Sequence, residues 1–163
     1  MSLNDILRPM NLPAWIISLP LLAAVVTVVL PRTGRWVGIT IAIITPLAVF
    51  LLCVEILVHG ALQLQVGGWQ APLGIQLYAD GLSTAILAIS AIVLACSTFY
   101  ASSYFTGKTG SRFFWPLWLF LWAALNALFL SGDIFNLYVT LELLGLSAVA
   151  LVALSQTADA LTA

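Results

Sequence analysis

The chain has 163 residues, of which 63% are hydrophobic and 7% are charged, and its net charge is -1 at neutral pH. A soluble domain carries about 25% charged residues, so most of this chain is expected to lie in lipid or inside a membrane complex. The sequence holds no basic patch that would bind nucleic acid, and its two cysteines lie inside apolar runs, which argues against a disulfide framework.

Apolar runs bounded by proline, glycine and charge divide the chain into five segments of about the length that spans a bilayer. The predicted helices cover residues 12–30, 36–58, 81–105, 113–130 and 133–155. Pro46 predicts a kink in the second of them. Aromatic residues near the predicted ends should form an interfacial belt, namely Trp36, Trp69, Tyr104 and Trp115. We therefore expect an all-α integral membrane protein in which residues 1–163 form a single membrane domain.

The cations predict an orientation in the membrane. Arg32 and Arg35 lie between the first two spans, Lys108 and Arg112 lie between the third and fourth, and the loops after the second and fourth spans hold none. The positive-inside rule then places the N-terminus outside and the C-terminus in the cytoplasm, across the inner (plasma) membrane, with Arg8 as the one cation that disagrees. No signal peptide is expected, because the apolar run that begins near residue 12 exceeds an h-region of about 7–15 residues.

The segment between the second and third spans, residues 59–80, is too long to be a simple connection. It contains two alternating stretches, 62–66 and 75–78, separated by Gly-Gly and a proline. This pattern is typical of a β-hairpin with a broad turn, although an irregular polar loop fits the periodicity equally well.

Most charged side chains lie at chain ends or in loops, where solvated flank charges need no function: Asp5, Arg8, Arg32, Arg35, Lys108, Arg112 and Asp159. Glu55 is near the outer end of the second span with His59 one turn further on, so an interfacial pair is expected, with proton entry as the alternative role. Asp80 and Asp133 precede the third and fifth spans. A carboxylate is favoured there by capping and by the helix dipole, without any role in transport.

Glu142 differs from these residues because it lies near the middle of the apolar segment 134–154. A carboxylate at that depth costs roughly 2.5 kcal/mol or more unless it is paired or faces water, so ion or proton handling is the default hypothesis, and a protonated, hydrogen-bonded Glu is the alternative. On an α-helix Glu142 shares its face with Tyr138 and Gly145. Polar residues fall on a nearly opposite stripe that could hydrogen-bond to a neighbouring helix: Asp133, Asn136, Thr140 and Ser147.

Two stretches resemble a known family. The sequence SGDIFNLYVTLELLGLSAVALVALS, residues 131–155, is similar to the G-D-x-F-N-L-Y-V-x-x-E core of the D-type subunits of Mrp-type multisubunit sodium/proton antiporters. It is similar, more loosely, to the antiporter-like subunits of respiratory complex I and of membrane-bound hydrogenases. The sequence GGWQAPLGIQLYADGLS, residues 67–83, resembles the segment that precedes the third helix in the same family. The resemblance covers nearly the whole chain.

The resemblance implies a role for Glu142. In that family a Glu on the fifth helix pairs with a lysine on a broken seventh helix, and together they gate proton passage at mid-membrane. Asp133 matches the family's Asp at the start of the fifth helix, with a structural or proton-access role. Accessory candidates are Tyr138, Asn136, Glu55 and His59. The family also has an extracytoplasmic hairpin between its second and third helices.

The chain also departs from the family. Family members have about fourteen helices, whereas five are expected here, and no Lys, Arg or His lies centrally in any predicted span. The chain is then either one piece of a split subunit or a fragment of a longer product. We expect other membrane subunits as partners, including a chain that supplies the missing helices and a lysine near Glu142.

The predicted function is that of a subunit in a multisubunit proton or sodium/proton translocating complex. The alternative is a non-conducting scaffold subunit of a complex related to complex I or to hydrogenases. No Cys/His cluster, nucleophile–base pair or phosphate loop is present in the sequence, so neither bond-making chemistry nor a cofactor is predicted. The sequence leaves open which ion moves and whether redox chemistry drives it.

Overall fold

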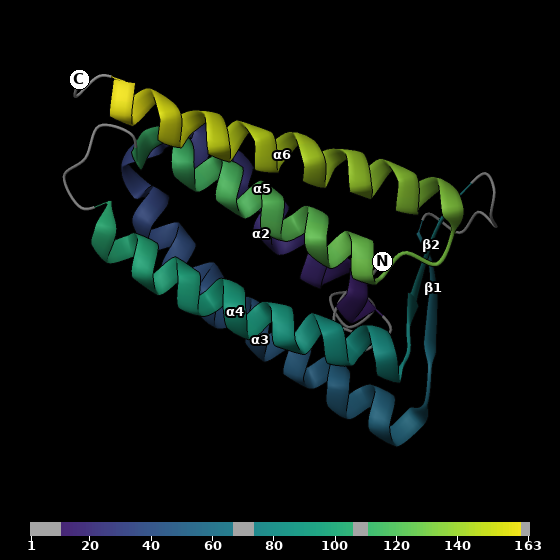
Figure 1. Cartoon of the computed structure of the whole chain (residues 1–163). Helices are drawn as coiled ribbons and strands as arrows, with labels where there is room; N and C mark the ends of the chain where they lie inside the picture. Colours follow the sequence, from purple (N-terminus) through teal and green to yellow (C-terminus); the bar gives the residue numbers. More distant parts are fainter. Residues whose placement is uncertain (1–10, 67–73, 106–110, 161–163) are drawn as a thin grey trace.

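The computed structural model describes residues 11–66, 74–105 and 111–160, with the side chains of the last helix as far as Leu154. Five long helices run through these residues (Figure 1): α2 (Leu12–Val29), α3 (Gly34–His59), α4 (Gly81–Tyr104), α5 (Ser111–Phe129) and α6 (Ile134–Ala160). A 3-10 turn, η2 (Pro31–Thr33), joins α2 to α3. In the part of the chain that the structure describes, each of the five helices contains a segment long and apolar enough to cross a membrane. The predicted fold class is confirmed.

The helix ends differ from the predicted ranges in an instructive way. Helix α3 begins at Gly34 and α5 at Ser111, so each includes an arginine that was predicted to lie in a loop. Helix α6 continues to Ala160, past its apolar span, which ends at Leu154, because no glycine or proline interrupts residues 155–160. Charge and polarity therefore mark where the apolar span ends rather than where the helix ends. Asp5, Arg8, Trp69 and Lys108 lie outside the described residues, and so does the side chain of Asp159.

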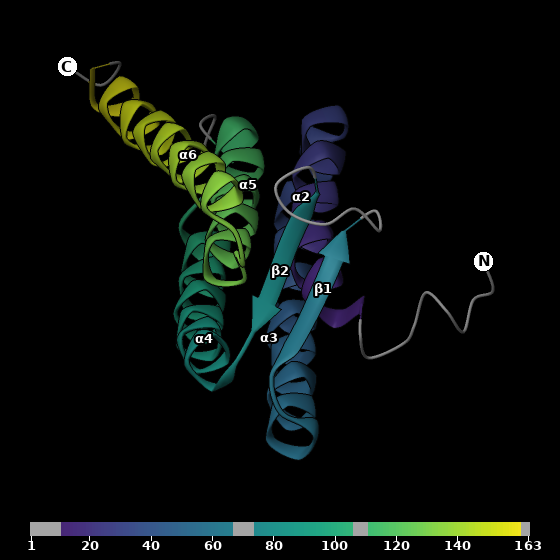
Figure 2. The same ribbon diagram turned by 90° about the vertical axis from the view of Figure 1, so that its right-hand side faces the viewer.

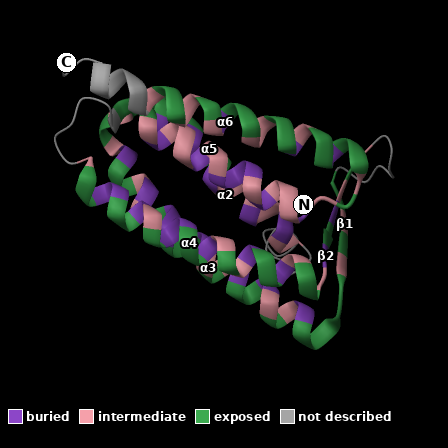
Figure 3. Ribbon diagram, viewed as in Figure 1, coloured by how far each residue is buried: buried purple, intermediate pink, exposed green. Residues whose placement is uncertain are grey.

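The helices pack in a definite order. Helix α3 runs along α4, α2 runs along both α3 and α5, and α6 packs chiefly along α5. Helix α6 therefore lies at the edge of the bundle, and its outer side is largely exposed (Figures 1 and 3). Two clusters of buried apolar side chains form the interior. The first holds Ile16, Val49, Leu52, Ile56, Leu77, Ala79, Leu87, Ala91 and Leu130. The second holds Ala23, Ala24, Ile41, Ala42, Leu94, Ala95, Leu119 and Trp122.

A proline inside α2 explains one buried polar contact between helices. Pro20 has no N–H, so the carbonyl of Ile16, four residues earlier, loses its intrahelical donor. The side-chain amide Nδ2 of Asn126 on α5 donates to that carbonyl at 2.9 Å. Asn126 and Ile16 are both fully buried, and an unpaired carbonyl there would cost about 1–3 kcal/mol. The contact satisfies the carbonyl and fixes α2 against α5.

Close packing of α3 against α5 depends on two glycines. A Cβ atom added to Gly38 would lie 2.4 Å from Cζ3 of Trp115, and one added to Gly34 would lie 2.7 Å from its Cδ1. The indole fills the groove that these glycines leave, and Trp115 is 3% exposed. The expectation that Trp115 belongs to an interfacial belt is therefore wrong. Trp36 and Tyr104, in contrast, are exposed.

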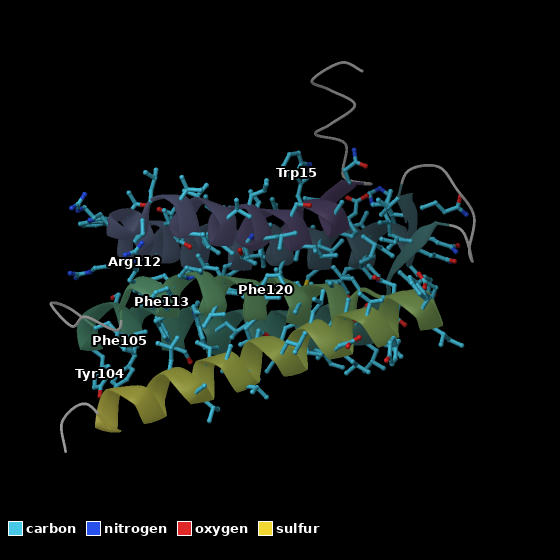
Figure 4. All side chains as sticks on the ribbon, turned by 90° about the horizontal axis from the view of Figure 1, so that it is seen from above. Trp15, Tyr104, Phe105, Arg112, Phe113 and Phe120 are labelled. Carbon is cyan, nitrogen blue, oxygen red and sulfur yellow. The ribbon has the colours of Figure 1, made fainter. Side chains whose placement is uncertain are left out.

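Aromatic side chains connect α4 to α5 at the end of the bundle opposite the hairpin (Figure 4). The ring of Phe105 lies 5.1 Å from that of Tyr104 and 4.3 Å from that of Phe114. One turn further along α5, the indole Nε1 of Trp118 donates to Oγ1 of Thr98 at 2.8 Å. This end of the bundle also carries Arg112, so we call it the arginine end.

The predicted hairpin is present and lies across the other end of the bundle, which we call the hairpin end (Figure 2). Strand β1 (Leu62–Val66) pairs antiparallel with β2 (Ile75–Ala79), with Leu62 opposite Ala79 and Val66 opposite Ile75. The predicted broad turn, 67–73, lies outside the described residues.

The other edge of β2 pairs with the connection between α5 and α6. The N–H of Tyr78 donates to the carbonyl of Leu130 at 2.8 Å, and the N–H of Gly132 donates to the carbonyl of Gln76 at 2.8 Å. A side chain at position 132 would crowd this pairing, because a Cβ there would lie 3.0 Å from the Gln76 carbonyl oxygen. Strand β2 is thus held on both sides.

Candidate functional site

The carboxylate of Asp133 begins α6 and also contacts the hairpin. Its Oδ1 accepts from the backbone N–H of Asn136 at 2.7 Å, which is N-cap geometry. Its Oδ2 accepts from the backbone N–H of Gln76 in β2 at 3.0 Å. The side chain of Asn136 donates to Oγ of Ser131 at 3.0 Å. Both oxygens of Asp133 are therefore engaged in structural hydrogen bonds at the start of α6.

The polar stripe of α6 faces the bundle. Asn136, Thr140 and Ser147 are all buried, which matches the face assigned from helical spacing. Their hydrogen bonds differ from the expectation of bonds to a neighbouring helix. The hydroxyl of Thr140 donates to the carbonyls of Asn136 and Leu137, and that of Ser147 donates to the carbonyl of Leu144. These hydroxyls bond to carbonyls of their own helix, so the stripe offers small, internally satisfied groups to α5.

Glu142 lies on the other face of α6, which the described chain leaves uncovered. Its side chain is exposed and has neither a hydrogen bond nor an ion pair to any described residue. Its neighbours on that face are also exposed: Tyr138 is 65% exposed, Leu146 is 62% exposed, and a Cβ atom added to Gly145 would have no atom of the described structure within 4 Å. Eight residues separate Glu142 from the start of the helix, which corresponds to about 12 Å of rise. The apolar part of α6 is 21 residues long, so Glu142 lies near the middle of that apolar segment.

The exposed face of α6 around Glu142 combines a carboxylate with a glycine and apolar side chains. Apolar side chains on an outer helix face normally contact lipid, but a carboxylate among them carries a large desolvation cost in hydrocarbon. A helix face that carries Glu142 and Gly145 one turn apart suits contact with another helix better than contact with lipid, because a glycine permits close approach of two backbones. The geometry therefore favours further protein against this side of α6.

The other titratable candidates lie elsewhere. His59 Nδ1 is 3.1 Å from Glu55 Oε1, so the predicted pair is present, with the Glu55 side chain 24% exposed and that of His59 66% exposed. This pair lies at the hairpin end of α3, on the far side of the bundle from α6 (Figures 1 and 2). The structure therefore does not bring Glu55 and His59 together with Glu142 or Asp133.

Asp80 caps α4. Its Oδ1 accepts from the N–H of Ser83 at 2.7 Å while the Ser83 hydroxyl accepts from the N–H of Asp80 at 2.8 Å, which completes a capping box. Hydrogen bonds from the Ser83 backbone and side chain lower the pKa of the Asp80 carboxyl below its ordinary value. The capping interpretation accounts for every contact that this carboxylate makes with described residues.

Sequence reasoning missed two residues with structural contacts: Gln76, which contacts Asp133, and Asn126, which joins α5 to α2. Gln76 contacts Asp133 only through its backbone, so its residue type carries no signal. Asn126 did leave a signal, because a buried Asn in an apolar helix needs a partner. Pro20 frees a carbonyl in a second helix, but the sequence gives no indication that these two helices are neighbours.

The five long apolar helices of the described structure define a multi-pass membrane protein. No family model matches the chain. It is 35% identical over 106 residues to the D-type subunit of the Na(+)/H(+) antiporter of Alkalihalophilus pseudofirmus, a match that covers 65% of this chain and 22% of that protein. It is 33% identical over 164 residues to a Staphylococcus epidermidis protein named as antiporter subunit mnhD2, a match that covers 100% of this chain and 32% of that protein.

A solved structure agrees with these relatives. A chain of the membrane-bound sulfane sulfur reductase, an archaeal respiratory membrane complex, superposes with a TM-score of 0.71 at 27% identity, covering 86% of this chain and 30% of that chain. The chain belongs to the family of D-type antiporter subunits. It spans less than a third of the length of the curated relatives it matches.

Proposed function

We propose that this chain is part of a subunit of a multisubunit, ion-translocating membrane complex of the sodium/proton antiporter kind, and that Glu142 is a carboxylate on its ion path. The observation that carries the proposal is the position of Glu142, near the middle of the apolar segment of α6 and on a face that the described chain does not cover. A carboxylate in hydrocarbon without a partner would be strongly disfavoured, whereas one at an internal protein interface can bind and release a proton.

The part of the family's proteins that this chain does not match would pack against the exposed face of α6. Because the chain spans less than a third of its curated relatives, we propose that it corresponds to the first part of a subunit of about fourteen helices, and that residues 1–163 form one membrane domain within it. The missing helices, on another chain or on a longer product, would pack against the Glu142 face. One of them would bring a lysine to within about 6 Å of the carboxylate and stabilise its charged form.

The other site residues have different relations to this path. Tyr138 shares the uncovered face one turn before Glu142, so its hydroxyl is placed to hydrogen-bond with groups of the covering helices. Asp133 and Asn136 would act through the position of α6, because their hydrogen bonds hold its first turn. The Glu55–His59 pair would lie at the membrane surface, outside the proposed ion path.

The charge distribution supports an orientation in the plasma membrane. Arg112 lies at the arginine end, opposite the hairpin, and Arg32 and Arg35 flank the start of α3, which begins at that same end. The positive-inside rule then puts the arginine end in the cytoplasm and the hairpin outside. The N-terminus would be outside and the C-terminus cytoplasmic.

The test is transport by the assembled complex in inverted membrane vesicles. Replacing Glu142 with Gln removes the titrating group at nearly constant shape, and replacing it with Ala removes the side chain. Both variants should assemble and lose most cation-dependent proton movement, measured by recovery of a ΔpH-sensitive dye. Glu55→Gln is the matched control, since it neutralises another carboxylate outside the proposed path and should retain transport. Full transport by Glu142→Gln with normal assembly would favour a non-conducting scaffold.

The pairing requires a second, structural test. A structure of the complete assembly should place a lysine amine within about 6 Å of the Glu142 carboxylate. If no cation from any chain lies within that distance, the pairing proposal is wrong, even if Glu142 proves essential for transport.

A further inference from the structure

Three polar atoms in the interior of the bundle have no hydrogen-bond partner among the described residues: Oγ1 of Thr45, Nε1 of Trp122 and Oδ1 of Asn126. All three residues are 0% exposed. Buried polar atoms are nearly always paired with protein or with an ordered water, so each of the three requires an explanation. They belong to α3 and α5, and none of them is on α6, the helix that carries Glu142.

Helix geometry brings these three residues within about one turn of one another along the bundle. Helices α3 and α5 run in the same direction (Figure 1), and Trp115 fills the groove at Gly38. A step of seven residues, two turns, on both helices leads from that contact to Thr45 and Trp122 with only about 20° of drift. Asn126 is one further turn along the same buried stripe of α5.

This level lies between the two apolar clusters. Trp122 belongs to the cluster nearer the arginine end, and Asn126 bonds to Ile16, which belongs to the cluster nearer the hairpin. Two of the three prolines inside described helices also lie here, whereas Pro116 of α5 lies nearer the arginine end. Pro20 frees the Ile16 carbonyl, and Pro46, next to Thr45, leaves the carbonyl of Ala42 without its usual donor. The unpaired hydrogen-bonding atoms of the described interior are thus concentrated in one layer between the two apolar clusters.

We propose that this layer is a binding site for an ordered water molecule shared by Thr45, Trp122 and Asn126. The three groups are chemically complementary to one water. The Trp122 N–H can donate to it, the Asn126 carbonyl oxygen can accept from it, and the Thr45 hydroxyl can do either. Buried waters typically make about three such hydrogen bonds.

The same groups do not suit a cation. A hard cation such as Ca²⁺ takes about six to eight oxygen ligands, and the Trp122 N–H would direct its positive end toward the ion. The described charged side chains of α3 and α5 nearest to this level, Arg35, Glu55 and Arg112, are each ten residues away along their helices from Thr45 or Trp122, so a neutral hydrogen-bonding ligand fits best. The water would link α3 to α5 at the level where α2 and α3 each contain a proline and so lack one backbone hydrogen bond.

The sign of one stability change tests the proposal. Thr45→Val keeps the side-chain shape and removes the hydroxyl. If the water is present, it loses a partner and the thermal midpoint of the protein, purified in detergent with its co-purifying subunits, should fall by a few degrees. If the layer is dry, removing an unpaired hydroxyl should raise the midpoint, and the proposal is overturned. Thr27→Val is the matched control: Thr27 is also fully buried, but its hydroxyl bonds only to the carbonyl of Ala24, so its midpoint should change little.

Two further measurements read the site directly. A structure of the assembly that resolves buried waters should contain a density peak within hydrogen-bond distance of all three side chains, and that peak should be missing in Thr45→Val. Absence of the peak in the unmodified protein would overturn the proposal. A midpoint that rises in sodium chloride relative to potassium chloride, and loses this rise in Thr45→Val, would also overturn it by identifying a sodium site.

Discussion

The backbone N–H of Gln76 donates to a carboxylate oxygen of Asp133 across 3.0 Å, although the two residues are 57 positions apart in the chain. The other oxygen of Asp133 accepts from the first turn of α6. One side chain therefore ties the hairpin to the helix that carries Glu142. Because α6 otherwise packs chiefly on α5, this tie contributes to setting its position.

Replacing Asp133 with Ala should weaken both contacts. Loss of an N-cap of this kind costs about 0.5–2 kcal/mol, and the Gln76 N–H would lose its acceptor as well. Amide hydrogen exchange should become faster at Gln76 and at Asn136. Asp80→Ala, which removes the cap of α4 instead, should leave exchange at these two amides unchanged. Equal acceleration in both variants would mean that Asp133 has no particular role in joining hairpin and helix.

Replacing Gly38 with Ala should destabilise the bundle, because the new Cβ would lie 2.4 Å from the buried ring of Trp115. Overpacking of this kind costs about 1–3 kcal/mol, which thermal unfolding in detergent would detect. Gly81→Ala is the matched control: nothing lies within 4 Å of a Cβ at that position in the described structure, so little change is expected. A Gly38→Ala variant as stable as the control would contradict the packing of α3 on α5.

The contact between Asn126 and Ile16 can be tested through Pro20. Asn126→Leu should destabilise the protein by about 1–3 kcal/mol, because the Ile16 carbonyl is left unpaired. Adding Pro20→Ala restores an N–H four residues after Ile16, so the second change should recover part of that loss. Thermal unfolding of both single variants and the double variant gives the interaction energy. Strict additivity would argue against the proline as the reason for the contact.

Asp80 predicts a dependence of stability on pH. Its hydrogen bonds with Ser83 lower its pKa in the folded protein relative to the unfolded chain. The unfolded state therefore binds the proton more readily, and the stabilisation from this group is present above the ordinary pKa of Asp and is lost as the pH falls through the lowered value. Thermal midpoints from pH 7 down to pH 3 should fall less steeply in Asp80→Asn than in the unmodified protein. Parallel curves would mean that the cap contributes nothing to this dependence.

Gly145 provides a test of the cover over α6. Gly145→Leu adds a large side chain next to Glu142 on a face where nothing described lies within 4 Å, so the folding of this chain should be unaffected. If another helix packs closely here, the bulk should block its approach, and recovery of co-purifying subunits should drop. Val149→Leu, at an exposed position two turns after Glu142, adds a single methylene and controls for surface changes. Unchanged co-purification with Gly145→Leu would place the partner elsewhere.

Much of this architecture was predictable from the sequence because a membrane simplifies the problem. Long apolar runs identify the helices, and the spacing of Asn136, Thr140 and Ser147 identified the inward face of α6. The same spacing separated Glu142 from that face. The alternating residues of β1 and β2 predicted a hairpin, but an irregular loop remained equally consistent until the strand register was known.

Contacts between segments that are distant in the chain could not be predicted from the sequence. The pairing of β2 with residues 130–132 uses backbone groups, which every residue type shares. The position of Trp115 near a helix end predicts an interfacial side chain, but the groove that buries it depends on glycines of another helix. Burial of a particular side chain is a property of the neighbour as much as of the residue.

The double pairing of β2 has a consequence for the order in which the protein is made. Strand β2 meets its second partner only after α4 and α5 have been synthesised, since that partner follows Phe129. In the proposed orientation, α4 and α5 must both enter the bilayer before β2 can pair with residues 130–132 on the extracytoplasmic side. The hairpin would spend that interval with one edge unpaired, so closure of the sheet is a late step that reports whether the fourth helix has crossed.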